Sequence, residues 1–397
     1  MSAAAAPAAP VAAPVAVAAS AIDPAALVRT FRAAGLGPFG GVPCSFLGPV
    51  ISCLQREHPE DYLIAANEGE AVAVAAGARL AGRLPVVVLQ NSGLGNAVNP
   101  LTSLCHTLRL PLLLLVTWRG EPGRPDEPQH ELMGRITPDL LTAMDIRHEP
   151  LPPDETRLAE RLAVAVDHMT ATGLPYAFVV SKGAVAPYRP EPTAAGPAAA
   201  SAPAAPMLRA EAIGEVMRTV GGRPVPVVAT TGKTARELER DWDRPENLYV
   251  VGSMGCASSV ALGVALERPR EHVVVLDGDG AALMRLEAMA AIGRLQPPRL
   301  VHVLFDNAAY ESTGAQPTGS ASVDFAGVAA ACGYPRTADV SDSDGLRAAL
   351  DGSLSGAEGP WLIRVRIAPG SDPRLGRPAL SPPLSAARFQ KAVSCDQ

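Results

Sequence analysis

The feature that most constrains this chain is a series of short, continuous apolar runs, each followed by a stretch with helical periodicity. In the first half these runs span residues 62–65, 85–90, 112–117 and 176–181. In the second half they span residues 225–229, 248–251, 272–276, 300–305 and 361–367. Continuous apolar runs are typical of parallel strands that helices cover on both faces. The pattern therefore predicts an α/β fold with two doubly wound parallel sheets.

A bridge of low sequence complexity separates the two halves. Residues 187–206 are rich in Pro and Ala and show no periodicity, which is the composition of a linker. We therefore expect domains at residues 22–186 and 207–388, with tails at 1–21 and 389–397. Asp23-Pro24 predicts the start of the first helix, because Asp is a favoured N-cap and Pro is favoured directly after it.

Charge and composition exclude several classes of protein. The net charge is −6 and no long basic run is present, which argues against a nucleic-acid-binding protein. No run of 18 apolar residues is present, so no membrane span is expected. The Ala/Pro-rich start lacks a basic segment and is a poor signal peptide, so a disordered tail is the better interpretation. The six cysteines show no metal-ligand spacing and are interpreted as reduced thiols of a cytoplasmic protein.

Two polar motifs follow neighbouring strands of the second predicted sheet. Asp277-Gly278-Asp279-Gly280 ends one apolar run, and Asp306-Asn307 ends the next. Ligands of open α/β sheets bind at this carboxyl edge, and a carboxylate, an amide oxygen and ligand phosphates suit Mg²⁺. A different hypothesis is a phosphatase of the DxDG type, with Asp277 as nucleophile and Asp279 as general acid/base. That chemistry also requires a downstream Lys, and the only Lys after the motif is Lys391.

The two motifs together resemble the signature of the thiamine-diphosphate-dependent decarboxylase family, in which GDG is followed by Asn one helix and one strand later. The family's motif usually ends Asn-Asn, and Asp306 departs from it. The resemblance implies two domains of the thiamine-diphosphate-binding fold, one for the aminopyrimidine ring and one for the diphosphate and Mg²⁺. It implies that the metal ligands are Asp279, Asn307 and the carbonyl of Ala309, and that the cofactor also contacts Gly278 and Gly280.

A second glycine motif, Gly252-Ser253-Met254-Gly255, precedes a helical stretch of small residues. Glycines before a helix N-terminus are suited to hold a diphosphate. By the resemblance, Gly252 and Ser253 contact the cofactor, and Met254 takes the place of the large residue that supports the thiazolium ring.

The first half carries the candidate activating acid. Glu68 lies between the apolar run at 62–65 and an apolar helical stretch. A carboxyl group against the aminopyrimidine ring favours the tautomer that removes the thiazolium proton, and Glu68 matches the family's catalytic Glu. An ordinary Glu at a helix start would only complement the helix dipole, the role we expect for Glu70. The polar loop 90–96 adds Asn91 as a candidate cofactor contact.

The resemblance also bears on the substrate. It is carried by the segments 41–45, 90–93, 99–103, 117–123, 126–130 and 231–234. It implies decarboxylation of 3-phosphonopyruvate through the ylid and enamine of the cofactor, with 3-sulfopyruvate as the alternative substrate.

A dianionic substrate requires cationic donors, and the candidates are Arg119, Lys233 and Arg236. His130 is a candidate for substrate binding or proton relay, although a lone loop His is more often structural. Cys44 is assigned no role.

In this family the active site lies between two such domains, normally of different subunits. The resemblance therefore implies a homodimer or homotetramer.

Overall fold

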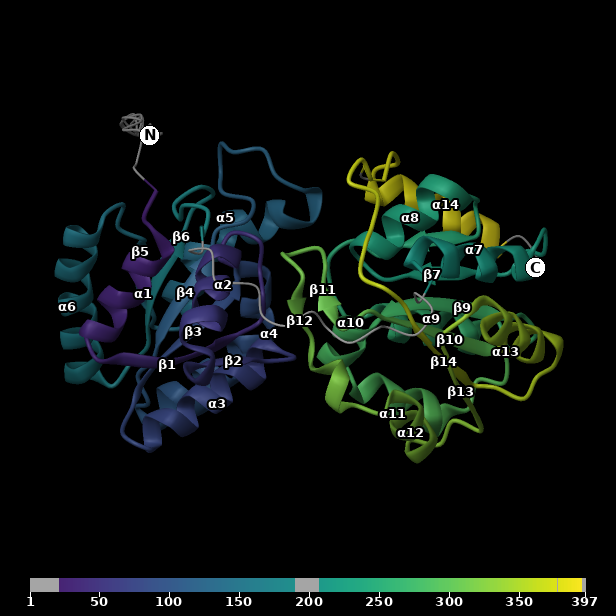
Figure 1. Ribbon diagram of the computed structural model, residues 1–397, viewed down its shortest axis with the longest axis horizontal. Helices are drawn as coiled ribbons and strands as arrows, with labels where there is room; N and C mark the ends of the chain where they lie inside the picture. Colours follow the sequence, from purple (N-terminus) through teal and green to yellow (C-terminus); the bar gives the residue numbers. More distant parts are fainter. Residues whose placement is uncertain (1–20, 190–206, 377, 395–397) are drawn as a thin grey trace, which may run out of the picture.

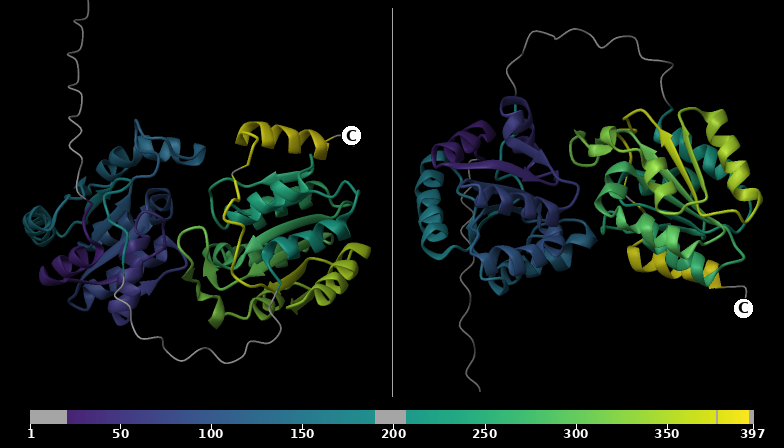
Figure 2. Two further views of the ribbon diagram at one scale, coloured as in Figure 1. Left: turned by 45° about the horizontal axis from the view of Figure 1, so that its top comes forward. Right: turned by 90° about the horizontal axis from the view of Figure 1, so that it is seen from below.

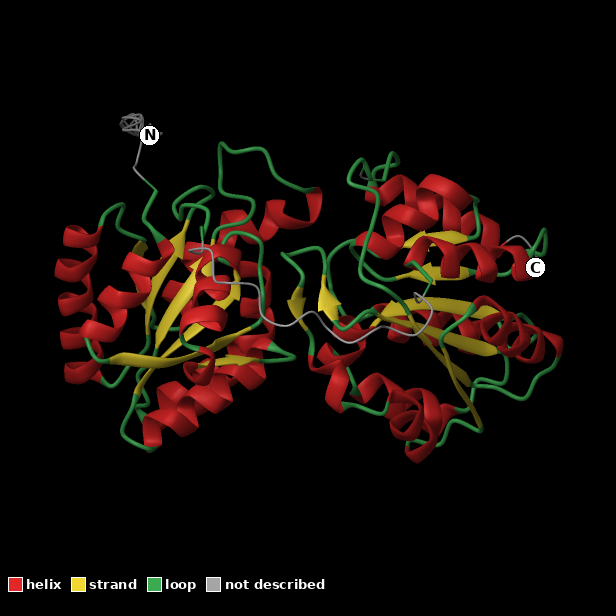
Figure 3. Cartoon of the chain, viewed as in Figure 1, coloured by secondary structure: helices red, strands yellow, loops and turns green. Residues whose placement is uncertain are grey.

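A computed structural model describes residues 21–189, 207–376 and 378–394 of the chain (Figure 1). The described residues form two six-stranded parallel sheets and a two-stranded hairpin. Helices lie on both faces of each sheet, and the two α/β domains lie side by side in all views (Figures 2 and 3). The prediction of two doubly wound parallel sheets is confirmed.

The first sheet has the strand order β2-β1-β3-β4-β6-β5. The elements of this domain are α1 (Pro24–Ala33), β1 (Leu36–Gly41), α2 (Gly48–Glu57), η1 (Pro59–Asp61), β2 (Tyr62–Ile64), α3 (Glu68–Leu80), β3 (Leu84–Gln90), η2 (Asn91–Gly93), α4 (Leu94–Asn99), the π-helix η3 (Pro100–His106), β4 (Leu113–Thr117), α5 (Pro128–Ala143), β5 (Arg147–Pro150), α6 (Glu155–Thr172) and β6 (Tyr176–Val180).

The second sheet has the strand order β13-β14-β10-β9-β7-β8. Its domain contains α7 (Arg209–Val220), β7 (Val227–Ala229), α8 (Lys233–Trp242), β8 (Asn247–Tyr249), α9 (Ala257–Glu267), β9 (Val273–Gly278), α10 (Asp279–Met284), α11 (Glu287–Leu295), β10 (Leu300–Asp306), β11 (Ala309–Tyr310), β12 (Gln316–Pro317), η4 (Gly319–Ser322), α12 (Phe325–Ala331), β13 (Arg336–Val340), α13 (Ser343–Ser355), β14 (Trp361–Arg366) and α14 (Pro382–Ser394).

The central strands are apolar without interruption because each of their faces meets a separate layer of helices. In β3, Val86 and Val88 pack in the core shared with α1, α2 and α6, whereas Val87 and Leu89 pack in the core shared with α3, α4 and α5. The second sheet repeats this division between α7 and α13 on one face and α9, α11 and α12 on the other. Burial on both faces is what the continuous apolar runs predicted.

Strand β1 was not predicted, because its sequence Leu-Gly-Pro-Phe-Gly-Gly has little apolar character. It nevertheless lies between β2 and β3. A Cβ atom at Gly41 would lie 1.9 Å from the carbonyl oxygen of Val88, so only glycine allows the two strands to approach this closely. The edge strands β5 and β13 were also missed, since Arg, Glu and Asp interrupt their sequences.

The predicted helix start at Asp23 is confirmed, because its side chain accepts a hydrogen bond from the amide of Ala26 at 2.8 Å. At the other end of the chain, α14 continues to Ser394, and Phe389 is buried against the second domain. The predicted tail from 389 is therefore helical up to residue 394. Residues 1–20 of the predicted tail and residues 190–206 of the predicted linker lie outside the described residues.

Candidate active site

A cavity of about 840 Å³ lies between the two domains. Polar contacts join the domains at its rim: the Asn67 amide donates to the carbonyl of Met284 at 3.3 Å, and Arg285 donates to the side chain of Asn96 at 2.6 Å. Nearly all predicted site residues line this cavity, namely Glu68, Arg119, His130, Lys233, Arg236, Gly252, Ser253, Met254, Gly278, Asp279, Gly280, Asn307 and Ala309.

Glu68 opens helix α3 directly after strand β2, and the helix is capped by the side chain of Asn67, which accepts from the amide of Gly69 at 2.7 Å. The Glu68 side chain is buried, and its Oε2 accepts a hydrogen bond from the Asn96 amide at 2.7 Å. A Cβ atom at Gly93 would lie 2.3 Å from Oε1, so the bare backbone of Gly93 leaves the room that the carboxyl group occupies.

Glu70 lies two residues further along α3, on the opposite side of the helix, in a different environment. It is exposed, and its Oε2 accepts from the amide of Ala66 at 2.9 Å, just before the helix. This is the N-terminal role that the sequence predicted for Glu70. Burial and contact with the cavity therefore distinguish Glu68 from its near neighbour.

The backbone at 252–255 forms a concave turn before helix α9. Gly252 has φ +70°, Ser253 has φ 43° and Gly255 has φ +89°. At Gly255 a Cβ atom would also lie 2.8 Å from the carbonyl oxygen of Ala281, so only glycine fits. Such turns of main-chain N–H groups before a helix suit an anion, and this turn therefore fits a diphosphate. Met254 stands within it and lines the cavity.

Asp279 begins helix α10 at the carboxyl end of β9 and is buried. The pKa of Asp279 is raised to about 6: burial raises it most, the hydrogen bond from Thr318 partly opposes this, and the negative charge of Asp306 adds to the rise. The hydroxyl of Thr318 donates to Oδ2 of Asp279. A Cβ atom at Gly280 would lie 2.4 Å from the ring of Tyr310, so this glycine allows the ring to pack against the motif.

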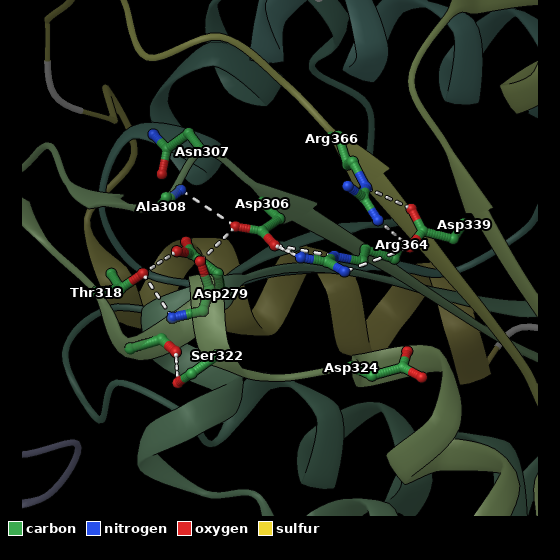
Figure 4. A network of polar contacts seen from close by, with 12 residues as sticks. Asp279, Asp306, Asn307, Ala308, Thr318, Ser322, Asp324, Asp339, Arg364 and Arg366 are labelled. Carbon is green, nitrogen blue, oxygen red and sulfur yellow. Dashed lines mark hydrogen bonds and ion pairs between the residues drawn. The ribbon is translucent and has the colours of Figure 1, made fainter.

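Asn307 and Ala309 follow β10, beside Asp279 (Figure 4). The side-chain oxygen of Asn307 accepts from the amide of Ala309 at 3.0 Å, and Ala308 between them has φ 56°. Among the described residues no group of three His, Cys, Asp or Glu side chains could hold a metal. One carboxylate, one amide oxygen and one carbonyl, completed by ligand oxygens, fit Mg²⁺ rather than a softer metal.

The cationic side chains in the cavity differ in their partners. Arg119 donates from Nε and Nη2 to the two carboxylate oxygens of Asp126, at 2.8 and 2.5 Å, and its guanidinium lies 5.0 Å from the ring centroid of Phe46. Among the described residues, the side chains of Lys233 and Arg236 have no hydrogen-bond or ion-pair partner. The charge of Arg119 is thus already balanced, whereas Lys233 and Arg236 leave two cations for an anionic ligand.

His130 lies in the first turn of helix α5 and is buried. Its pKa is lowered to about 4, mainly by burial and also by the positive charge of Arg119, so the imidazole is neutral near pH 7. Its Nδ1 atom has no partner among the described residues. The group can therefore exchange a hydrogen bond with a ligand but does not contribute a positive charge.

Three further residues, Asn91, Cys44 and Asp277, do not line the cavity. Asn91 is fully buried, and its amide donates to the carbonyl of Arg119 at 2.8 Å and to the hydroxyl of Thr137 at 3.0 Å. It is not among the residues that line the cavity, so its position does not support the predicted cofactor contact. The thiol of Cys44 is buried, which raises its pKa to about 12 and keeps it neutral.

Asp277 is fully buried, accepts from the amide of Gly278 at 2.9 Å, and contacts His302 at 3.2 Å. It does not line the cavity and cannot reach a substrate there. The phosphatase hypothesis, which needs Asp277 as nucleophile, is therefore wrong.

Sequence reasoning missed Asn96 and Thr318, which hold the two key carboxylates. Asn96 lies in helix α4, within the polar, glycine-rich segment 90–96 that the sequence showed after β3, so its polar character was a usable signal. Thr318 follows β12, and nothing in the spacing connects it with Asp279, 39 residues away.

Comparisons with known proteins agree with this geometry. Residues 24–140 match the N-terminal, and residues 230–365 the C-terminal, thiamine pyrophosphate-binding domain of thiamine pyrophosphate enzymes. The chain is 43% identical to the phosphonopyruvate decarboxylase of Streptomyces viridochromogenes over 94% of this chain and 95% of that protein. It is 43% identical to the phosphonopyruvate decarboxylase of Streptomyces hygroscopicus over 90% of each chain.

A more distant relative is the sulfopyruvate decarboxylase of Methanosarcina acetivorans, which is 30% identical over 92% of this chain and 96% of that protein. No helix among the described residues is both long and apolar enough to cross a membrane. With both cofactor-binding domains matched and both halves of the site facing one cavity, the chain belongs to the thiamine pyrophosphate enzyme family and is one of its decarboxylases.

Proposed function

We propose that this chain decarboxylates 3-phosphonopyruvate to phosphonoacetaldehyde and CO₂, a step of phosphonate biosynthesis, with thiamine diphosphate and Mg²⁺ bound in the interdomain cavity. The observation that carries the proposal is the meeting of three features there: the buried Glu68, the oxygen donors around Asp279, and the unpaired cations of Lys233 and Arg236. The two Streptomyces relatives, similar over almost their whole length, support the same substrate.

The residues present fit the cofactor and the metal. The turn at 252–255 would hold the diphosphate, and Asp279, Asn307 and the carbonyl of Ala309 would hold Mg²⁺. When bound, thiamine diphosphate supplies a carbon nucleophile and a sink for the electrons that the departing CO₂ leaves behind. The work of the protein is to position these groups and to place charge and protons around them.

Glu68 is the candidate acid for the aminopyrimidine ring. Asn96 fixes its Oε2, and no described residue donates a hydrogen bond to Oε1, which is therefore the oxygen available to the ring. Burial excludes water from the carboxyl group, so its proton is exchanged with the ligand rather than with solvent.

The phosphonate carries close to two negative charges near neutral pH. Lys233 and Arg236, at the start of α8, supply charge-assisted donors that no protein carboxylate occupies among the described residues. Arg119, held by Asp126, is better suited to shape the cavity wall or to offer its remaining donors to the substrate carboxylate. The sulfonate of 3-sulfopyruvate, the second candidate, has a similar shape and one charge fewer, and the Methanosarcina relative favours it.

Glu68→Gln tests the activating acid. The amide keeps the size of the side chain and can still bond to Asn96, but it cannot exchange the proton. We expect kcat to fall by at least about 10²-fold, the scale of lost proton-transfer catalysis, while the affinity for thiamine diphosphate changes much less. Steady-state decarboxylation and cofactor titration measure the two effects. Glu70→Gln, two residues away and outside the cavity, should keep the wild-type rate, and a Glu68→Gln enzyme with wild-type turnover would exclude Glu68 from this role.

The pKa of Asp279 predicts a pH dependence of cofactor binding. Because that pKa is raised to about 6, the metal-free site is protonated below this pH and cannot bind Mg²⁺. Mg²⁺-dependent retention of thiamine diphosphate should therefore weaken about tenfold per pH unit below pH 6 and level off above it. Titration of Mg²⁺ and cofactor into EDTA-stripped protein at several pH values measures this. Asp279→Asn should lose most of the retention at every pH, and wild-type retention that did not change with pH would contradict the assignment.

Lys233→Ala tests the choice of substrate. A hydrogen bond to a charged group contributes about 1.5–3 kcal/mol, so kcat/KM for 3-phosphonopyruvate should fall roughly 10- to 100-fold. The residual reaction with pyruvate, which has a methyl group in place of the phosphonate, should change little, and 3-sulfopyruvate should lie between the two. Lys391→Ala, on the exposed helix α14, is the matched control. Equal losses on all three acids, or a wild-type preference for pyruvate, would rule out phosphonate recognition by Lys233.

We further propose that the chain forms a homodimer or homotetramer. Helix α3 exposes Val74 and Leu80, at 47% and 69%, and α9 exposes Val260 and Leu266, at 38% and 45%. These exposed apolar side chains are candidate contacts between chains, and sedimentation should give a mass of at least two chains. Val74→Glu should shift the mass toward one chain, whereas Leu384→Glu on α14 should not. A monomeric wild-type protein would contradict the proposal.

A further inference from the structure

The first residue of the pair Asp306-Asn307 is a carboxylate where the family usually has an amide, and it is almost completely buried. Its Oδ2 accepts from Nε and Nη2 of Arg364, at 2.9 and 2.5 Å. Its Oδ1 accepts from the hydroxyl of Ser320 at 2.8 Å and from the amide of Ala308 at 3.1 Å. Both oxygens of Asp306 are thus engaged by the protein (Figure 4).

These contacts lead directly to the candidate metal ligand. Thr318 donates its hydroxyl to Asp279 and its amide to the carbonyl of Ala308, at 3.0 Å for the amide. The amide of Ser320 in turn donates to the hydroxyl of Thr318 at 3.3 Å. Asp306 therefore lies at the centre of a network that ties the loop after β10, the segment 318–320 and the start of α10 together.

On its other side the network is anchored in the sheet. Arg364 projects from β14, pairs with Asp339 of β13 at 3.3 Å, and lies 5.6 Å from the ring centroid of Phe325. Its side chain is 11% exposed. A guanidinium this buried requires a carboxylate partner, since an unpaired charge in the interior is strongly unfavourable.

We propose that Asp306 and Arg364 form a positioning pair for the metal site. Arg364 pairs with Asp306 and occupies its Oδ2, so that the extra carboxylate does not compete for Mg²⁺ and repels Asp279 less than a free carboxylate would. Asp306 in turn fixes Ala308 and Ser320, and thereby the loop that presents Asn307 and Ala309. This inference rests on the proposed cofactor site. It predicts that residues 306 and 364 act as one unit, because an amide at 306 would leave the buried Arg364 with only its 3.3 Å contact to Asp339 as a charged partner.

The test is a double-mutant cycle with Asp306→Asn, Arg364→Leu and the double variant. The measured quantity is the Mg²⁺ concentration that half-saturates thiamine diphosphate binding to the folded, EDTA-stripped protein, determined by calorimetry without turnover. Each single variant should raise this concentration at least about tenfold, because each removes the strongest partner of a buried charge beside the metal loop. The double variant should recover most of the wild-type affinity, a rescue that a general loss of stability would not produce.

Arg366→Leu is the matched control, because Arg366 pairs with Asp339 at the exposed end of the same network and does not contact Asp306. It should leave the Mg²⁺ dependence unchanged. Should circular dichroism show that a single variant does not fold, Ser320→Ala takes its place, since it removes one hydrogen bond to Asp306 and keeps the ion pair. A several-fold higher half-saturating Mg²⁺ concentration would then support the positioning role of the pair.

Wild-type Mg²⁺ dependence in the folded single variants, or in Ser320→Ala where these do not fold, would overturn the inference. The inference would also be overturned if the double variant needed as high a Mg²⁺ concentration for half-saturation as the more strongly affected single variant. A wild-type protein that fails to bind thiamine diphosphate with Mg²⁺ would overturn the proposed function instead, and the inference with it, so the two failures are distinguishable.

Discussion

Burial of the central strands on both faces is the constraint on which the rest of the molecule depends. Strands such as β9 and β10 present apolar side chains to a helix layer on either side, so their faces have no room for a polar ligand. Polar side chains with access to a ligand are displaced to the carboxyl ends of the strands. Asp279 follows β9, Asn307 follows β10 and Glu68 follows β2, and all three face the cavity between the sheets.

The same constraint explains which parts of the fold the sequence could predict. A strand covered on both faces is a continuous apolar run and can be recognised locally, as for β3, β4, β9 and β10. Strand β1 holds its place through a close backbone approach at Gly41, which depends on a neighbour 47 positions later in the sequence and has no local signature. Edge strands such as β13 pair on one side only and carry charged residues, so their sequence resembles that of a loop.

The site shows a similar division. Glu68, Asp279 and Asn307 were predictable because each ends a recognisable strand or opens a recognisable helix. Thr318, which donates to Asp279, and Arg364, which pairs with Asp306, were not predictable, because both reach these carboxylates only through tertiary packing. The sequence also could not show that the charge of Arg119 is balanced by Asp126 whereas Lys233 has no partner among the described residues. Only the spatial neighbours of a cation show whether it is already neutralised.

In the proposed site, much of the contact with the ligand would come from the main chain. The turn at 252–255 would offer N–H groups, and position 309 would offer a carbonyl oxygen, regardless of the side chains carried there. What evolution must preserve at these positions is a set of dihedral angles, including the positive φ of Ser253 and Ala308. Homologues can therefore diverge in residue identity around the diphosphate while keeping its binding intact, and exchange of a glycine for alanine there would be more damaging than many changes of polarity.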